Sequence, residues 1–303
     1  MTGKQFLRLS KQAITAWSDD YAPSMGAALS YYTLFSITPL LVILIAIAGF
    51  FFGADAVRHQ ILAQLAGLMG EEGAGTVDAL LRAANRPDEG GIAALISIFV
   101  LVIGATTVIN ELQSDLDRIW HAPAAHTGSG ARAFLRARFV SVVVILTIAF
   151  VLMVSLVFSA AVAAVAKWWG DAAGRWQFVA RALDLGLSFA VMTLLFALIY
   201  KIVPRVRIAW RDVWVGAAVT SLLFAVGKVL IGIYLGRSGI STGFGAAGSL
   251  VLVMVWVYYS AQIFLVGAEF TWVYAHERGS RRTDSRSGAR KQRTGHEKSA
   301  ERT

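Results

Sequence analysis

The stretch AAGSLVLVMVWVYYSAQIFLVGAEFTWVY, residues 246–274, decides the fold, because it carries a single charged residue, Glu269, in an otherwise apolar run. A helix needs about 20 apolar residues to cross the hydrocarbon core of a bilayer, and this run is longer than that. Its apolar residues are continuous rather than alternating, which favours a helix over a barrel strand. The stretch therefore predicts a transmembrane helix.

Similar runs occur along most of the chain and predict an all-α integral membrane protein, a bundle of six transmembrane helices. The chain has 303 residues, of which 56% are hydrophobic and 16% charged, with a mean hydropathy of +0.61. Soluble domains carry about 25% charged residues. The predicted transmembrane domain covers residues 27–275, with spans at 27–52, 91–110, 139–166, 183–203, 213–235 and 246–274.

Three segments outside the spans have their own patterns. Residues 1–26 form a cytoplasmic segment in which apolar residues at helical spacing over 4–18 predict an amphipathic helix at the membrane surface. The loop 53–90 is too long for a turn, and its periodicity predicts two short amphipathic helices in the first periplasmic loop. Residues 276–303 are polar and basic, which predicts a disordered tail.

Lys and Arg are distributed unequally between the two sides of the predicted bundle. Twenty lie in the N-terminal segment, the second and fourth loops and the tail, whereas seven lie in the other three loops. Basic residues are retained on the cytoplasmic side. We therefore expect both termini in the cytoplasm.

Motifs that suggest chemistry occur in the wrong context. Gly243, Gly245 and Gly248 match the dinucleotide-binding pattern, but that pattern needs a soluble strand, turn and helix. The glycine-serine motif at 236–239 resembles that of an intramembrane serine protease, yet no predicted span holds a histidine to act as its base. There is no cysteine. We expect no enzyme activity, no metal site and no cofactor.

Three blocks of sequence carry a family resemblance. They are SYYTLFSITP at residues 30–39, YKIVP at 200–204, and the region from Gly236 through WVYYS at 256–260 to Gly267-Ala268-Glu269. With them the chain resembles the YihY/BrkB family of bacterial inner-membrane proteins, once labelled ribonuclease BN. The resemblance implies six helices in the bacterial inner membrane, for which roles in envelope lipid handling or in resistance to host killing are proposed. No clustered acids or histidines support the nuclease label.

Ionisable residues within spans are costly, so they are paired or functional as a rule. Glu269 falls at the same predicted depth as the polar ends of the first, second and fourth spans. We expect a polar cavity open to the cytoplasm, to which Pro39 contributes by kinking the first span; its candidate residues are Tyr31, Tyr32, Pro39, Asn110, Glu111, Tyr200 and Glu269. Asp184 and Lys228 share a second depth and predict an intramembrane ion pair.

Two functions remain open at this point. Polar layers at two depths suit a transporter or flippase that passes the headgroup of a lipid or other amphiphile between leaflets. The same residues suit a scaffold or regulator whose helices are held by hydrogen bonds and which transports nothing. Membrane lipids are the expected partners, with anionic headgroups at the basic tail; nucleic acid is not expected, and a homo-oligomer is left open.

Overall fold

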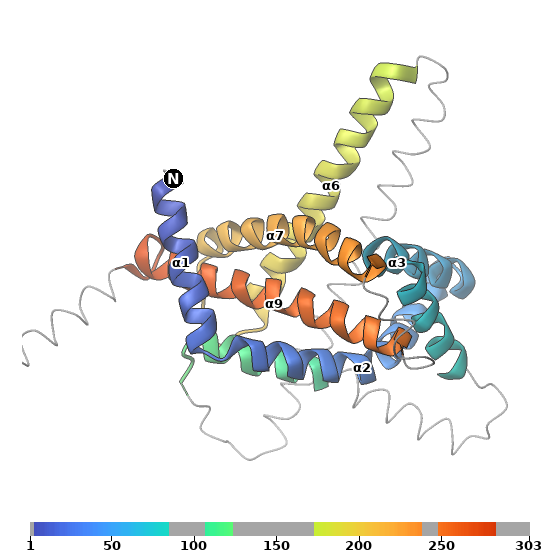
Figure 1. Cartoon of the computed structure of the whole chain (residues 1–303), viewed down its shortest axis with the longest axis horizontal. Helices are drawn as coiled ribbons and strands as arrows, with labels where there is room; N and C mark the ends of the chain where they lie inside the picture. The colour runs from blue at the N-terminus through green and yellow to red at the C-terminus, as the bar shows by residue number, and fades with distance from the viewer. Residues whose placement is uncertain (1–2, 85–106, 124–172, 238–247, 283–303) are drawn as a thin grey trace, which may run out of the picture.

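The computed structural model of the chain describes residues 3–84, 107–123, 173–237 and 248–282. In this part of the chain the regular elements are helices (Figure 1). They are α1 (Gly3–Asp19), α2 (Ala22–Phe52), α3 (Ala54–Ala84), α6 (Ala173–Ile202), α7 (Trp210–Arg237) and α9 (Gly248–Glu277), with a further helix over residues 107–119.

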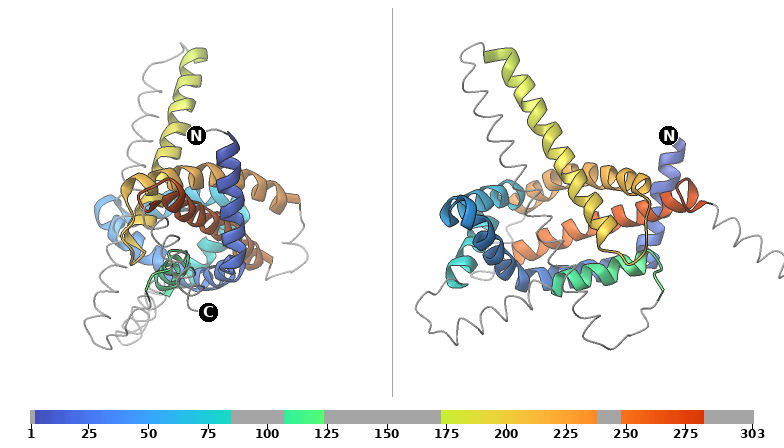
Figure 2. Two further views of the ribbon diagram at one scale, coloured as in Figure 1. Left: turned by 90° about the vertical axis from the view of Figure 1, so that its left-hand side faces the viewer. Right: turned by 180° about the vertical axis from the view of Figure 1, so that it is seen from behind.

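The central element is α9, which contacts α1, α2, α3 and α7, while α6 packs on α7. Figure 1 shows α2, α7 and α9 running along the long axis of the molecule, with α1 crossing them at one end and α6 leaving the bundle at a steep angle. The views in Figure 2 agree with this arrangement. The prediction of an all-helical bundle around the 246–274 stretch is therefore confirmed.

Four of the six predicted spans correspond to described helices, namely α2, α6, α7 and α9. Among the described residues, three helical stretches are long and apolar enough to cross a membrane: Leu185–Ile202, Trp210–Tyr234 and Leu250–Glu277. The predicted second and third spans, at 91–110 and 139–166, lie almost entirely outside the described residues. Six spans thus stay a prediction.

The loop after the first predicted span is helical, as its periodicity indicated. α3 follows α2 directly, and the two are separated by Gly53, whose φ of 85° suits a residue without a Cβ. Inside α3, Gly70 is non-helical (φ 82°, ψ 168°) and divides the helix into two parts. Val77 and Leu81 of the second part are buried against Leu41 of α2 and the first half of α9.

The N-terminal helix is amphipathic, but part of its apolar face is covered by protein. Leu9 and Ala13 are buried against Phe270 and Val273 of α9. Tyr21 joins α1 to α2 in the left-handed backbone region, with φ 59° and ψ 34°. The change of chain direction at Tyr21 places α1 across the end of α9.

The contact between α7 and α9 is built from two identical pairs of residues, a glycine followed four positions later by a threonine. On α7 the pair is Gly216 and Thr220, and on α9 it is Gly267 and Thr271. The Thr220 hydroxyl donates to the Gly216 carbonyl at 2.8 Å, and the Thr271 hydroxyl donates to the Gly267 carbonyl at 2.7 Å. Each threonine lies over the glycine of the other helix, because a Cβ added at Gly216 would lie 1.7 Å from Thr271 Oγ1 and one at Gly267 would lie 2.0 Å from Thr220 Oγ1. The absence of both Cβ atoms lets the helices approach closely.

Candidate functional site

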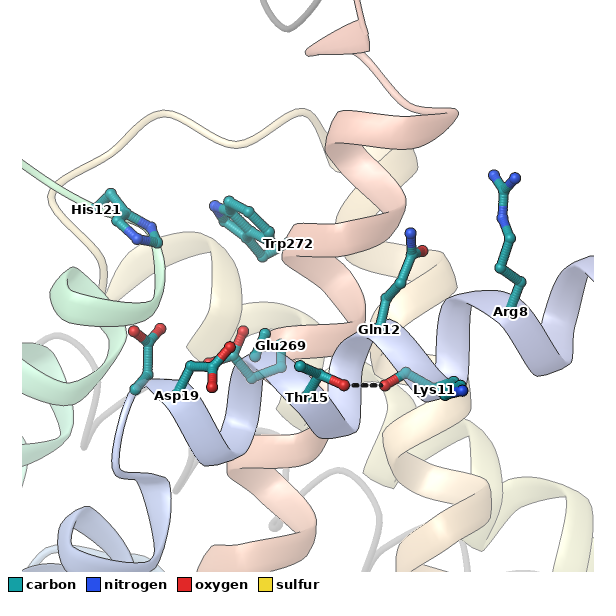
Figure 3. Close-up of a pocket in the computed structure, with 10 residues that line it drawn as sticks. Arg8, Lys11, Gln12, Thr15, Asp19, His121, Glu269 and Trp272 are labelled. Atoms are coloured by element: carbon teal, nitrogen blue, oxygen red, sulfur yellow. Dashed lines mark hydrogen bonds between the residues drawn. The ribbon is translucent and has the colours of Figure 1, made fainter.

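A cavity of about 450 Å³ lies at the end of the bundle that α1 crosses. Its walls come from α1, from α9 and from the segment that follows the helix at 107–119 (Figure 3). The lining residues are Arg8, Lys11, Gln12, Thr15, Ala16, Asp19, Asp20, His121, Glu269 and Trp272. Three segments far apart in sequence therefore meet at this place.

Glu269 forms the floor of the cavity and is almost completely buried, with 1% of its surface exposed. Its two carboxyl oxygens have no donor group within hydrogen-bond reach in the described part of the chain, where the side chain that comes closest to such a bond is the carboxyl of Asp20. The carboxyls of Asp20 and Asp19 at the end of α1 are close enough to act on it electrostatically. In Figure 3, Asp19 and Thr15 lie in front of it. The floor of the cavity thus gathers three carboxyl groups, and the buried one has no donor group beside it among the described residues.

The opposite end of the cavity is basic. Arg8 and Lys11 lie on α1 three residues apart and so project from the same side of the helix. Arg8 also forms an ion pair with Glu277 in the last turn of α9, which holds the start of α1 against that helix. Lys11 is exposed. The cavity therefore presents positive charge at its rim and negative charge at its floor.

Aromatic rings form the remaining wall. The Trp272 ring has its centroid 5.4 Å from that of His121 and 4.4 Å from that of His276. His276 also contacts the Trp272 carbonyl through Nδ1 at 2.9 Å. These contacts fix the Trp272 ring in place beside the charged floor.

Two contacts fix α1 over the cavity. The Phe6 and Phe270 rings pack at a centroid distance of 5.7 Å. The Trp17 indole N–H donates to Gln262 Oε1 at 3.0 Å, although the two residues are far apart in the sequence. A ring contact near the start of α1 and a hydrogen bond near its end therefore hold the helix in place, and with it Arg8, Lys11 and Asp19.

Tyr200 lies next to this site rather than in its lining. The side chain is completely buried, its hydroxyl donates to the Phe264 carbonyl at 2.8 Å, and it lies 3.0 Å from Thr220 Oγ1. These bonds join α6, α7 and α9 one to two turns from Glu269. Tyr200 is thus a helix-joining residue in this conformation.

The remaining candidates for the predicted polar cavity lie elsewhere. Tyr31 is 53% exposed, and its ring packs edge-on against Tyr32 at 5.6 Å. Asn110 is exposed and Glu111 half-buried on the helix at 107–119. Of the predicted set, Glu269 is the member that lines the observed cavity, and joint action of the others stays a prediction.

Two more predictions concern side chains that are not fully described. α2 continues as one helix through Pro39, whose side chain lies outside the described ones, so its kink stays a prediction. Lys228 is exposed on α7. The side chain of Asp184, its predicted partner, also lies outside the described ones, and the ion pair stays a prediction.

Sequence reasoning missed most of the cavity. Of the residues that line it, the sequence singled out Glu269 and gave no role to Asp19, Asp20 or His121. The sequence did contain a signal for this site, because Asp19 and Asp20 stand side by side just before the first apolar run and Glu269 lies in the last one. Within residues 3–84, 107–123, 173–237 and 248–282, no group of three or more His, Cys, Asp or Glu has an arrangement that could hold a metal ion.

Comparison with known proteins gives the chain its relatives. A family model described as "Virulence factor BrkB" matches residues 13–292. A "UPF0761 membrane protein" of Tolumonas auensis is 25% identical over 261 residues, covering 83% of this chain and 80% of that protein. A homologue of the same description from Pseudomonas aeruginosa is 24% identical over 256 residues, and this chain spans 58% of its length.

A more distant relative has a different kind of name. The "Putative ribonuclease-like protein YfkH" of Bacillus subtilis is 20% identical over 263 residues, covering 86% of this chain and 92% of that protein. No solved structure matches the chain.

Proposed function

The chain belongs to the virulence factor BrkB family of membrane proteins, and we propose that it moves a lipid or another amphiphile between the leaflets of the bacterial inner membrane. Loading begins at the cavity between α1 and α9. The observation that carries the proposal is Glu269, a buried carboxyl that faces this cavity without a hydrogen-bond donor among the described residues. A charge kept at that cost inside a membrane protein is a functional candidate.

The position of α1 supports a cavity at the membrane surface. α1 crosses the end of the bundle (Figure 1), and its side chains Leu7 and Ile14 are 70% and 57% exposed. Lys4 and Lys11 lie along one side of this apolar strip on the helix. Apolar residues beside lysines are typical of a helix that lies in the interface of a bilayer. We place this end in the cytoplasm, with six spans and both termini on that side, from the excess of basic residues.

A cavity at that depth suits an amphiphile. A lipid presents its headgroup at the level of an interfacial helix while its chains remain in the hydrocarbon. The basic rim and the acidic floor then offer contacts to both signs of charge. The surrounding hydrocarbon accommodates the chains without a protein pocket.

A scaffold or regulator that transports nothing is the second candidate, and the Gly-Thr contact between α7 and α9 favours it. Together with the buried Tyr200 hydroxyl, that contact closes the bundle beside Glu269. In this function the cavity does not lead into the membrane. A nuclease is not part of either proposal, and we expect purified protein to leave RNA intact in the presence of divalent metal ions.

Lipid flux in proteoliposomes tests transport. The full-length chain is reconstituted with a lipid labelled on its acyl chain, and exchange between leaflets is followed by chemical quenching from outside. We expect faster exchange than in protein-free liposomes, and loss of that gain in Glu269→Gln. Glu71→Gln makes the same change at an exposed position of α3, outside the cavity, and should exchange like wild type. Wild-type flux equal to protein-free liposomes would overturn transport.

Access to the floor of the cavity separates transport from a closed scaffold. The chain has no cysteine, so a single Glu269→Cys change provides a specific label site. Transport predicts reaction with a membrane-impermeant thiol reagent from the cytoplasmic side only. Failure to react from either side in folded protein supports the closed scaffold.

A further inference from the structure

We infer that the cavity recognises a primary ammonium group, with Glu269 as its acceptor, so that the amphiphile is zwitterionic, as in a lipid with an ethanolamine headgroup. This inference rests on the proposed function and names its substrate class. It begins from the chemistry of the cavity floor rather than from the cavity's size. Three carboxyls of α1 and α9 meet there, one of them buried.

The buried Glu269 carboxyl needs hydrogen-bond donors. An ionised carboxylate accepts several hydrogen bonds, and buried polar groups almost always have hydrogen-bond partners. Both oxygens of Glu269 are shut off from solvent, and the described side chain that comes closest to a hydrogen bond with them is another carboxyl, that of Asp20, which has no donor when it is ionised. A ligand that completes this site must therefore bring N–H or O–H groups.

The charge at the cavity floor also matters. Asp19 and Asp20 add negative charge next to Glu269, and both border the same cavity. A cation relieves the repulsion among the three carboxyls, whereas a neutral hydroxyl does not. A charge-assisted hydrogen bond is also stronger than a neutral one. Donor and positive charge together point to an ammonium group.

Hydrogen-bond donors distinguish a primary ammonium from other cations at this site. A quaternary ammonium has no N–H to donate, so it leaves the Glu269 oxygens without partners. A divalent metal ion needs several ligands converging on one point, and the acids of the cavity do not have that arrangement. An ammonium with N–H groups is the cation that fits.

The residues along α1 place the rest of the headgroup. Lys11 and Arg8 lie about two and about three helical turns from Asp19 along α1, with Gln12 and Thr15 between Lys11 and Asp19. A phosphate attached to the ammonium by a short linker then lies toward the Lys11 end.

Headgroup selectivity tests the inference. Full-length protein in nanodiscs is titrated with lipids of identical labelled acyl chains that carry ethanolamine, N,N-dimethylethanolamine, choline or glycerol headgroups. We expect ethanolamine to bind about tenfold more tightly than choline or glycerol, the size of one charge-assisted hydrogen bond. The N,N-dimethyl lipid, which keeps one N–H, should bind more tightly than the choline lipid.

Variants assign the selectivity to the floor. Glu269→Gln should abolish the preference for ethanolamine, and Glu71→Gln, at an exposed position of α3 outside the cavity, should keep it. Size-exclusion profile and melting temperature report whether each variant is folded. If Glu269→Gln fails to fold, Asp19→Asn, an exposed change in the same cavity, should reduce the preference.

The outcomes separate the two proposals. Equal wild-type affinity for ethanolamine, choline and glycerol headgroups overturns the inference, as does a preference retained in both Glu269→Gln and Asp19→Asn. Selective binding without lipid flux overturns transport and leaves the recognition site standing. Lipid flux without a headgroup preference overturns the recognition site and leaves transport standing.

Discussion

Gly216→Ala at the contact of α7 with α9 should destabilise the bundle, although alanine is the better helix former. The new Cβ would lie 1.7 Å from Thr271 Oγ1 and 2.6 Å from Thr271 Cβ. Thr271 cannot easily rotate away, because its hydroxyl is bonded to the Gly267 carbonyl. The two helices must therefore separate locally, and overpacking of this kind costs about 1–3 kcal/mol.

Gly232→Ala is the matched control, since Gly232 lies on the same helix and an added Cβ there meets no neighbouring atom within 4 Å in the described part of the chain. Both changes gain the helix propensity of alanine, roughly 0.5–1 kcal/mol. The difference between them isolates the clash. We expect Gly216→Ala to unfold about 1–3 kcal/mol more readily than Gly232→Ala in a detergent unfolding titration.

A compensating change completes the test. Thr271→Gly removes the side chain that the new Cβ meets, so the double variant Gly216→Ala/Thr271→Gly should be more stable than the sum of the single changes implies. A Gly216→Ala protein as stable as Gly232→Ala, or additive behaviour in the double variant, would refute the close approach of the two helices.

Further predictions concern other parts of the bundle. Tyr200→Phe removes a hydroxyl with two buried partners and should cost about 0.5–1.5 kcal/mol of unfolding free energy, whereas Tyr258→Phe, on an exposed position, should cost nothing measurable. Burial, aided by the charge of Glu111, raises the pKa of Asp115 to about 7. The folded state therefore holds this proton more tightly than the unfolded chain, so the unfolding free energy should fall as pH rises from about 4 to about 7, and Asp115→Asn should remove that part of the pH dependence. An alkaline phosphatase fusion after Thr303 should be inactive in cells, and an active one would contradict the cytoplasmic C-terminus.

The helices were predictable where the apolar runs are long, because in a bilayer every backbone polar group must be bonded within the segment. Glu269 was predictable as a candidate for a related reason, since a lone carboxyl in such a run is costly. Its surroundings were not. The depth of a residue along a span follows from the sequence, but the direction in which its side chain points depends on which helices pack around it.

Tyr31 and Asn110 show that depth along a span does not predict which residues share a site. Both were placed level with Glu269 from their positions in the spans, and both are exposed in the structure. α1 occupies the place beside Glu269 instead, because Leu9 and Ala13 bury against Phe270. The periodicity of α1 predicted an apolar face and gave no information about which surface would cover it.

Tyr21, at the joint between α1 and α2, favours the detachment of α1 from the bundle. A residue other than glycine in the left-handed region costs roughly 1–2 kcal/mol, and the Tyr21 side chain, 70% exposed, recovers little of that cost by packing. Detachment of α1 relieves this strain while α9 keeps its contacts with α2, α3 and α7. The amide hydrogens of α1 should consequently exchange with solvent before those of α9, and each such opening uncovers Glu269.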